Sequence, residues 1–183
     1  MRWDADELST YSVEVRRRPQ KTFRSLRIDG DSTGLNFRAA GQGLTYDFRV
    51  VATDSAGNRS RPKSVTAVVP IDQTRKVIRL NSGWRRNVKR QSTYGGTLAR
   101  ATRAGAAATL SFVGRRVAVL APVNAPRSRF AITLDGVTRT VRIGGRGGLA
   151  KPVFDRRVEP GRHTIRIRAL DRRAMFDAIA VER

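Results

Sequence analysis

Residues 130–143 read FAITLDGVTRTVRI, and this stretch decides the fold class of the chain. Apolar and polar residues alternate on both sides of Asp135-Gly136. Alternation with a period of two is typical of a strand that buries one face. An Asp-Gly pair between two such runs predicts a tight hairpin turn. We therefore expect residues 130–143 to form an antiparallel β-hairpin.

The same alternation recurs along the chain. It is found at residues 11–16, 35–38, 46–52, 109–112 and 164–168, and clusters of Gly, Asp, Asn and Pro separate these runs. Residues 65–69 and 117–120 are apolar enough to form cores. No segment shows a convincing helical stripe. The pattern predicts an all-β chain built from two β-sandwich domains.

Composition excludes several classes of site. The 183 residues include no Cys and a single His, which excludes disulfide frameworks, thiolate zinc sites, cysteine nucleophiles and multi-histidine metal sites. No apolar run is long enough for a membrane helix, and the first residues lack the apolar segment of a signal peptide.

Charge is distributed unevenly between two parts of the chain. The net charge is +22, and residues 74–183 contribute +19 of it, with 25 Lys and Arg against 6 Asp and Glu. The polar stretch at residues 70–74 predicts a boundary between domains at residues 1–70 and 76–183, joined by a linker at 71–75. Such a charge favours contact with anionic polymers, although 32 Arg against 5 Lys is also what a GC-rich gene produces.

Residues 44–60, LTYDFRVVATDSAGNRS, resemble the penultimate strand and following turn of a fibronectin type III domain. The resemblance implies a tyrosine corner, in which Tyr46 is buried and its hydroxyl is bonded to nearby backbone. Gly57 or Asn58 is expected to supply a positive φ in the turn. Residues 8–17 and 64–69 resemble the third and last strands of that family.

The fibronectin resemblance is incomplete at the N-terminus. Trp3 resembles the core Trp that closes the family's second strand, yet only two residues precede it. The first strand and most of the second are absent. We therefore expect the chain to be the C-terminal part of a longer protein, or to have a misassigned start.

The second half carries a different series of motifs. In order, they are Gly83-Trp84, residues 94–98, 104–112, 117–122, 134–136, 160–167 and 176–181. This order is similar to that of the galactose-binding-like jelly-roll modules of bacterial secreted proteins. The resemblance implies a domain that binds carbohydrate, or one that is only structural or adhesive. It also implies a location outside the cell or at its surface.

A carbohydrate site needs an aromatic ring face and fixed polar groups in a concave place. The candidate ligand-binding residues are Trp84, Arg85, Arg86, Tyr94, Asn124, Arg127 and Arg146. Because Arg pairs bidentately with carboxylates, converging Arg-bearing loops would suit an acidic sugar. Core packing is the alternative for Trp84 and Tyr94, and solvated surface is the alternative for the Arg residues.

We find no catalytic constellation. His163 stands between a Pro-Gly turn and an alternating strand, so we expect a strand-entry residue rather than a base. Asp135, Asp155, Asp171 and Asp177 do not stand out as a glycoside hydrolase pair. We expect no cofactor except a possible structural calcium ion, although the spacing of these carboxylates matches no known calcium loop.

The function we expect is non-catalytic binding and spacing by a monomer, as an appendage of a larger secreted protein. The second domain would hold carbohydrate or an anionic cell-wall polymer, and a catalytic domain could lie upstream. Two alternatives stay open. One is a nucleic-acid or general polyanion binder, whose binding would fall steeply with salt. The other is a purely structural or adhesive module with a protein partner.

Overall fold

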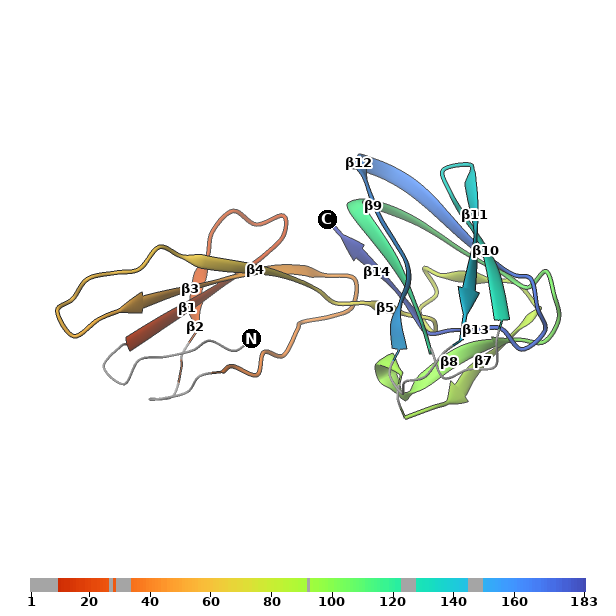
Figure 1. Cartoon of the computed structure of the whole chain (residues 1–183), viewed down its shortest axis with the longest axis horizontal. Coiled ribbons are helices and arrows are strands. Elements are labelled where there is room, and N and C mark those ends of the chain that lie inside the picture. Colours follow the sequence, from red (N-terminus) through yellow and green to blue (C-terminus); the bar gives the residue numbers. More distant parts are fainter. Residues whose placement is uncertain (1–9, 27, 29–33, 92, 123–127, 145–149) are drawn as a thin grey trace. The chain divides into compact units, whose positions relative to one another are not determined.

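A computed structural model of the chain describes residues 10–26, 28, 34–91, 93–122, 128–144 and 150–183. Within these residues every regular element is a strand apart from one 3-10 turn, which confirms the all-β prediction (Figure 1). The chain divides into two compact units, Met1–Val69 and Pro70–Arg183. The described part contains no helix with the length and hydropathy that crossing a membrane requires.

The first unit contains one antiparallel sheet with the strand order β2-β1-β3-β4. Its strands are β1 (Thr10–Arg17), β2 (Arg24–Leu26), β3 (Thr45–Thr53) and β4 (Lys63–Val68). One face buries Val15, Tyr46 and Phe48, and the ring of Phe37 packs edge-on against Tyr46 and Phe48 at centroid distances of 5.0 and 5.1 Å. A small aromatic core therefore holds this sheet.

Two local predictions for this unit are confirmed. Tyr46 is buried, and its hydroxyl accepts a hydrogen bond from the Ala40 N–H at 3.0 Å. Gly57 has a φ of +88°, and the N–H of Asn58 donates to the Asp54 carboxylate at 2.8 Å. The fibronectin assignment itself stays a prediction.

Two other predictions for this unit are wrong. Residues 65–69 do not form a core along their length, because β4 is an edge strand and Val65 is 49% exposed. Residues 35–38 alternate in burial as predicted but do not form a strand. Phe37 packs onto the apolar face of the sheet, so this segment lies against the sheet rather than beside an edge where its backbone could pair.

The opposite face of the first sheet is held by a buried carboxylate. Asp47 on β3 accepts hydrogen bonds from Arg18 at 2.7 Å, from Arg16 at 2.9 Å and from the Thr66 hydroxyl at 2.8 Å. The Arg18 hydrogen bond is the main cause that holds the pKa of Asp47 well below its usual range. Asp47 thereby links β3 to the end of β1 and to β4.

The second unit is a sandwich of a larger and a smaller sheet. The larger sheet has the order β11-β10-β12-β9-β14-β5, with β6 also paired to β9, and the smaller has the order β13-β8-β7. The elements are β5 (Ile71–Asp72), β6 (Arg79–Leu80), β7 (Trp84–Lys89), η1 (Tyr94–Gly96), β8 (Thr97–Ala101), β9 (Ala107–Pro122), β10 (Ser128–Leu134), β11 (Val137–Ile143), β12 (Ala150–Ala169), β13 (Met175–Phe176) and β14 (Ala178–Glu182). Residues 71–75, expected to be a linker, begin this unit, because β5 pairs with β14.

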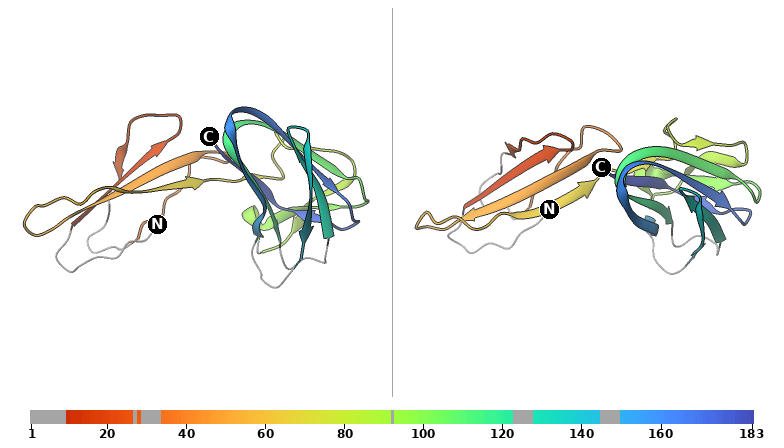
Figure 2. Two further views of the ribbon diagram at one scale, coloured as in Figure 1. Left: turned by 45° about the horizontal axis from the view of Figure 1, so that its top comes forward. Right: turned by 90° about the horizontal axis from the view of Figure 1, so that it is seen from above.

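The predicted hairpin is present as β10 and β11. Asp135 and Gly136 have φ values of 48° and 87°, which is the pattern of a type I′ turn. The long strands β9 and β12 pair along almost their whole length and curve together (Figure 2). A single continuous core lies between the two sheets and includes Phe130, Ile132, Ile165 and Ile167.

Candidate functional site

The structure places Trp84 in the core of the second unit. Its side chain begins β7 and is 7% exposed. The indole packs edge-on against Phe176, with ring centroids 5.2 Å apart, and lies 6.3 Å from the ring of Phe130. This is the core packing that the sequence left open for Trp84, and the ring offers no open face to a sugar.

The other predicted binding residues are not gathered into one cluster. Arg85 and Arg86 are exposed on β7, and Arg85 lies opposite Arg100 of β8. Tyr94 lies beyond the other end of β7, in the turn that leads to β8. Asn124, Arg127 and Arg146 fall outside the described residues. The structure therefore does not bring Trp84 and the two Arg residues together with Tyr94.

Tyr94 is instead held by a group of buried polar residues. Its N–H donates to the carboxylate of Asp177 at 2.9 Å. Asp177 is fully buried between β13 and β14, and Asp72 of β5 lies in register with the neighbouring Ala178. Gln73 is also fully buried, and its amide donates to the Thr97 hydroxyl at 3.2 Å. We call Asp72, Gln73 and Asp177 the buried acidic cluster.

Glycine is required in the turn above this cluster. Gly95 and Gly96 both have positive φ, at 68° and 74°, which favours residues without a Cβ. A Cβ on Gly95 would also lie 3.0 Å from an oxygen of Asp72. The backbone of the Tyr94 turn therefore approaches the buried acidic cluster closely.

Burial raises the pKa values of two groups at this cluster, the Asp177 carboxyl and the Tyr94 phenol. Burial raises the pKa of Asp177 to about 6; the hydrogen bond from Tyr94 opposes this rise, and the charge of Asp72 adds to it. Burial also raises the pKa of the Tyr94 phenol, with further contributions from Asp72 and Asp177. One oxygen of Asp177 and the amide oxygen of Gln73 are buried without a hydrogen-bond partner. A buried acceptor without a partner is costly, so these two oxygens are suited to accept a hydrogen bond from water or to coordinate a cation.

Calcium fits this cluster. Among the described residues no three His, Cys, Asp or Glu side chains come together, but the cluster supplies two carboxylates and an amide oxygen, the hard oxygen ligands that Ca²⁺ prefers. Asp72, Gln73 and Asp177 would hold the ion, with backbone carbonyls or water completing its shell. The bound charge would offset the repulsion between the carboxylates. Sequence reasoning considered Asp177 but missed Asp72 and Gln73, because both stand in the expected linker.

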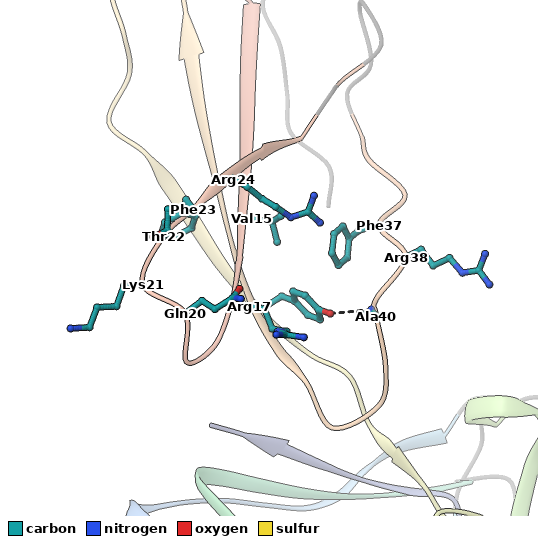
Figure 3. A pocket seen from close by; sticks show the side chains of 11 residues that line it. Val15, Arg17, Gln20, Lys21, Thr22, Phe23, Arg24, Phe37, Arg38 and Ala40 are labelled. Atoms are coloured by element: carbon teal, nitrogen blue, oxygen red, sulfur yellow. Dashed lines mark hydrogen bonds between the residues drawn. The ribbon is translucent and has the colours of Figure 1, made fainter.

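A second concave place lies in the first unit. It is a hollow of about 540 Å³ on the apolar face of the sheet, lined by Val15, Phe37 and Tyr46 among others. Figure 3 shows Arg24 reaching between Val15 and Phe37, whereas Lys21 and Arg38 point away. Phe37 and Tyr46 are already engaged in the core of this unit. We therefore assign the hollow to the packing of the first unit and give it no ligand.

His163 is engaged on both ring nitrogens. Nδ1 lies 2.6 Å from the Asp135 carboxylate, and Nε2 lies 2.8 Å from the carbonyl oxygen of Glu159. Both partners are hydrogen-bond acceptors, which favours the doubly protonated ring, and the hydrogen bond to Asp135 raises the pKa of His163. His163 lies inside β12, after the Pro160-Gly161 bend, rather than at the entry of a strand as expected.

Comparison with known proteins identifies the kind of fold. No protein-family model matches the sequence, and no curated protein matches it. Among solved structures, a family 35 carbohydrate-binding module from Clostridium thermocellum matches with a TM-score of 0.50 and 12% identity, covering 63% of this chain and 97% of the module. The fold is similar to that of a carbohydrate-binding module. The covered share of this chain is about the size of the unit Pro70–Arg183.

The same fold also occurs within a larger enzyme chain. An exo-β-1,3-galactanase from Phanerochaete chrysosporium, solved with galactose, matches with a TM-score of 0.50 and 16% identity. The match covers 72% of this chain but only 32% of the galactanase, so this chain spans about a third of that protein. At these identities the likeness shows the fold alone.

Proposed function

We propose that the second unit is a non-catalytic carbohydrate-binding module and that the first unit spaces it from other domains of a larger extracellular protein. The observation that carries the proposal is the match to almost the entire length of a carbohydrate-binding module, 97% of that chain. The engagement of both nitrogens of His163 supports a non-catalytic role.

The Tyr94 turn is the place where we expect the sugar. Tyr94 is half-buried, and its backbone is fixed by Asp177, so part of the ring is presented on a rigid support. Aromatic rings pack against the apolar face of sugars, and preorganised backbone lowers the entropy lost on binding. A calcium ion in the buried acidic cluster would make this support more rigid.

A glycan array probed with the full chain tests the proposal. We expect selective binding to a small set of glycans that persists from low to high salt. In the variant Tyr94→Ala the dissociation constant for the best glycan should rise about tenfold, whereas Tyr94→Phe, which keeps the ring, should bind nearly as wild type. An array without selective binding would contradict the proposal.

A further inference from the structure

The outer face of the larger sheet in the second unit has an unusual composition. Cross-strand partners in a sheet point to the same side, so the register identifies the members of this face. On the part of the sheet next to β10 they are Thr138, Thr140 and Arg142 of β11; Arg129, Ala131 and Thr133 of β10; Arg162, Thr164, Arg166 and Arg168 of β12; Ala107, Thr109, Ser111 and Val113 of β9; and Arg79 of β6. We call this set the Arg/Thr face.

The Arg/Thr face is turned away from the core. The alternating residues on the same strands, such as Phe130, Ile132 and Ile167, are fully buried between the two sheets. By contrast, Arg166 and Arg168 are exposed on β12. None of these residues is acidic or aromatic; farther along the same two strands, Asp155 of β12 forms an ion pair with Arg116 of β9.

Among the described residues, carboxylates neutralise only a small part of the positive charge on this face. Arg129 forms a bidentate pair with Asp171, at 2.9 and 3.1 Å. Within the described part of the chain, no carboxylate forms an ion pair with Arg79, Arg142, Arg166 or Arg168. Arg166 and Arg168 lie about 7 Å apart along one strand. Like charges at this distance repel each other, and an anionic ligand would relieve that repulsion.

Hydroxyl groups lie between these cations. Thr133 and Thr138 form a cross-strand hydroxyl pair at 2.7 Å, and Ser111 and Thr164 form another at 3.2 Å. At the β6 edge a hollow of about 430 Å³ is lined by Lys76, Val77, Arg79, Thr109 and Ser111. Two cations and two hydroxyls around one hollow form a donor set suited to an oxyanion.

We propose that the Arg/Thr face binds a sulfated polysaccharide lying flat across the sheet. The inference goes beyond the proposed function, because it adds a second glycan site on another face of the same unit. One guanidinium fork uses both oxygens of a carboxylate. A sulfate ester has a third terminal oxygen, which the Thr and Ser hydroxyls can reach.

The arrangement of charge also favours this class over nucleic acid. The Arg residues lie both along and across strands that are about 4.8 Å apart. An extended polysaccharide with sulfate groups on both sides can contact Arg residues on several strands at once. Single-stranded nucleic acids are bound on aromatic stacking platforms, and this face has none. Arg is also the weakly hydrated cation suited to oxyanion recognition.

Titration of the full chain with heparin, hyaluronan, dextran sulfate, dextran and duplex DNA tests the inference. We expect heparin and dextran sulfate to bind at least tenfold more tightly than hyaluronan, which carries only carboxylates, and neutral dextran. Hyaluronan or duplex DNA binding as tightly as heparin would overturn the proposal. Heparin binding should weaken as salt is raised, because exposed charges are screened.

Charge-matched variants locate the binding. The double variant Arg166→Gln/Arg168→Gln should weaken heparin binding about tenfold. The control Arg85→Gln/Arg86→Gln removes the same charge from β7 in the other sheet. It should change the affinity for heparin less than twofold. Equal weakening by both would show binding by net charge alone and contradict the proposal. Arg166→Lys/Arg168→Lys keeps the charge, and we still expect measurable weakening because the forks are lost.

The same variants separate this inference from the proposed function. Binding of a neutral glycan at the Tyr94 turn should be unchanged by Arg166→Gln/Arg168→Gln. Loss of heparin binding in Tyr94→Ala but not in the sheet variant would overturn the Arg/Thr face and leave the Tyr94 site standing. If the array shows no neutral ligand but heparin binding needs Arg166 and Arg168, the Tyr94 site would be lost and the Arg/Thr face would stand.

Discussion

Tyr46 fixes the backbone that precedes β3. Its hydroxyl accepts the Ala40 N–H, and its ring packs against Phe37 and Phe48. The variant Tyr46→Phe keeps the ring but leaves the Ala40 N–H without this partner. We expect the free energy of unfolding to fall by about 1–2 kcal/mol in urea denaturation. An unchanged value would show that the hydroxyl does not stabilise the corner.

His163 gives the second unit a pH-dependent contact. The hydrogen bond to Asp135 is the main cause of its raised pKa, and the Glu159 carbonyl adds to it. The folded state therefore binds this proton more tightly than the unfolded chain, whose His titrates near 6.5. The stabilisation is complete below that pH and is lost as the pH rises through the folded-state pKa.

The variant His163→Gln tests this linkage. At pH 6 we expect it to be less stable than wild type by about 0.5–1 kcal/mol, the range of a partly exposed ion pair. At pH 9 the two melting temperatures should approach each other. A difference that does not change between pH 6 and pH 9 would contradict an imidazolium at this position.

Asp177 is the residue on which calcium binding at the buried acidic cluster would depend. Calcium should raise the melting temperature of the wild-type chain by several degrees, because a ligand that binds only the folded state stabilises it. Asp177→Asn should abolish that rise, and Mg²⁺ should give little effect because it demands a smaller, octahedral site. An equal calcium effect in wild type and Asp177→Asn would rule out the buried acidic cluster as the site.

Among the elements, the close approach of the end of β14 to β9 depends on Gly114. A Cβ at this position would lie 2.6 Å from the carbonyl oxygen of Glu182 and 2.9 Å from Val181. Gly161, its partner on β12, has only ordinary contacts at 3.6 Å and beyond. We expect Gly114→Ala to destabilise the fold by about 1–3 kcal/mol.

Gly161→Ala is the matched control for that change. It lies directly opposite Gly114, and we expect it to alter the unfolding free energy by less than about 1 kcal/mol. Thermal denaturation of both variants measures the difference. Similar destabilisation by the two substitutions would mean that glycine is needed for flexibility of the bend rather than for close approach of β14.

Local signals explain which elements could be predicted from the sequence. The β10–β11 hairpin follows from alternation and an Asp-Gly turn, and the Tyr46 corner from a few neighbouring residues. Residues 35–38 show the same alternation but pack onto a sheet face, because strand formation also needs a partner at an edge. The sheet pairing of residues 71–72 was missed because the two-residue strand β5 carries no periodic signal.

The candidate site depended on contacts that a sequence does not show. An exposed Trp and a core Trp look alike in sequence, and Trp84 is placed by Phe130 and Phe176, far away along the chain. The outward Arg166 and Arg168 could be read from alternation on one strand. Their grouping with Thr133 and Thr109 required the order of β10, β12 and β9 in the sheet.

For the whole molecule, the structure shows where part of the net charge of +22 is placed. Most of it belongs to residues 74–183, and there part of it is arranged on one face of a sheet. The likeness of the fold to that of a carbohydrate-binding module, together with this cationic face, is the ground on which we propose a glycan rather than a nucleic acid as the partner.

Calorimetric titration of the full chain with the glycan that the array selects tests whether the second unit binds carbohydrate without cleaving it. We expect saturable binding at the Tyr94 turn and recovery of the glycan uncleaved. The heat of binding should be strongly reduced in Tyr94→Ala and retained in Arg85→Gln/Arg86→Gln. Absence of binding heat with every selected glycan, or cleavage of the glycan during the titration, would contradict a non-catalytic carbohydrate-binding module.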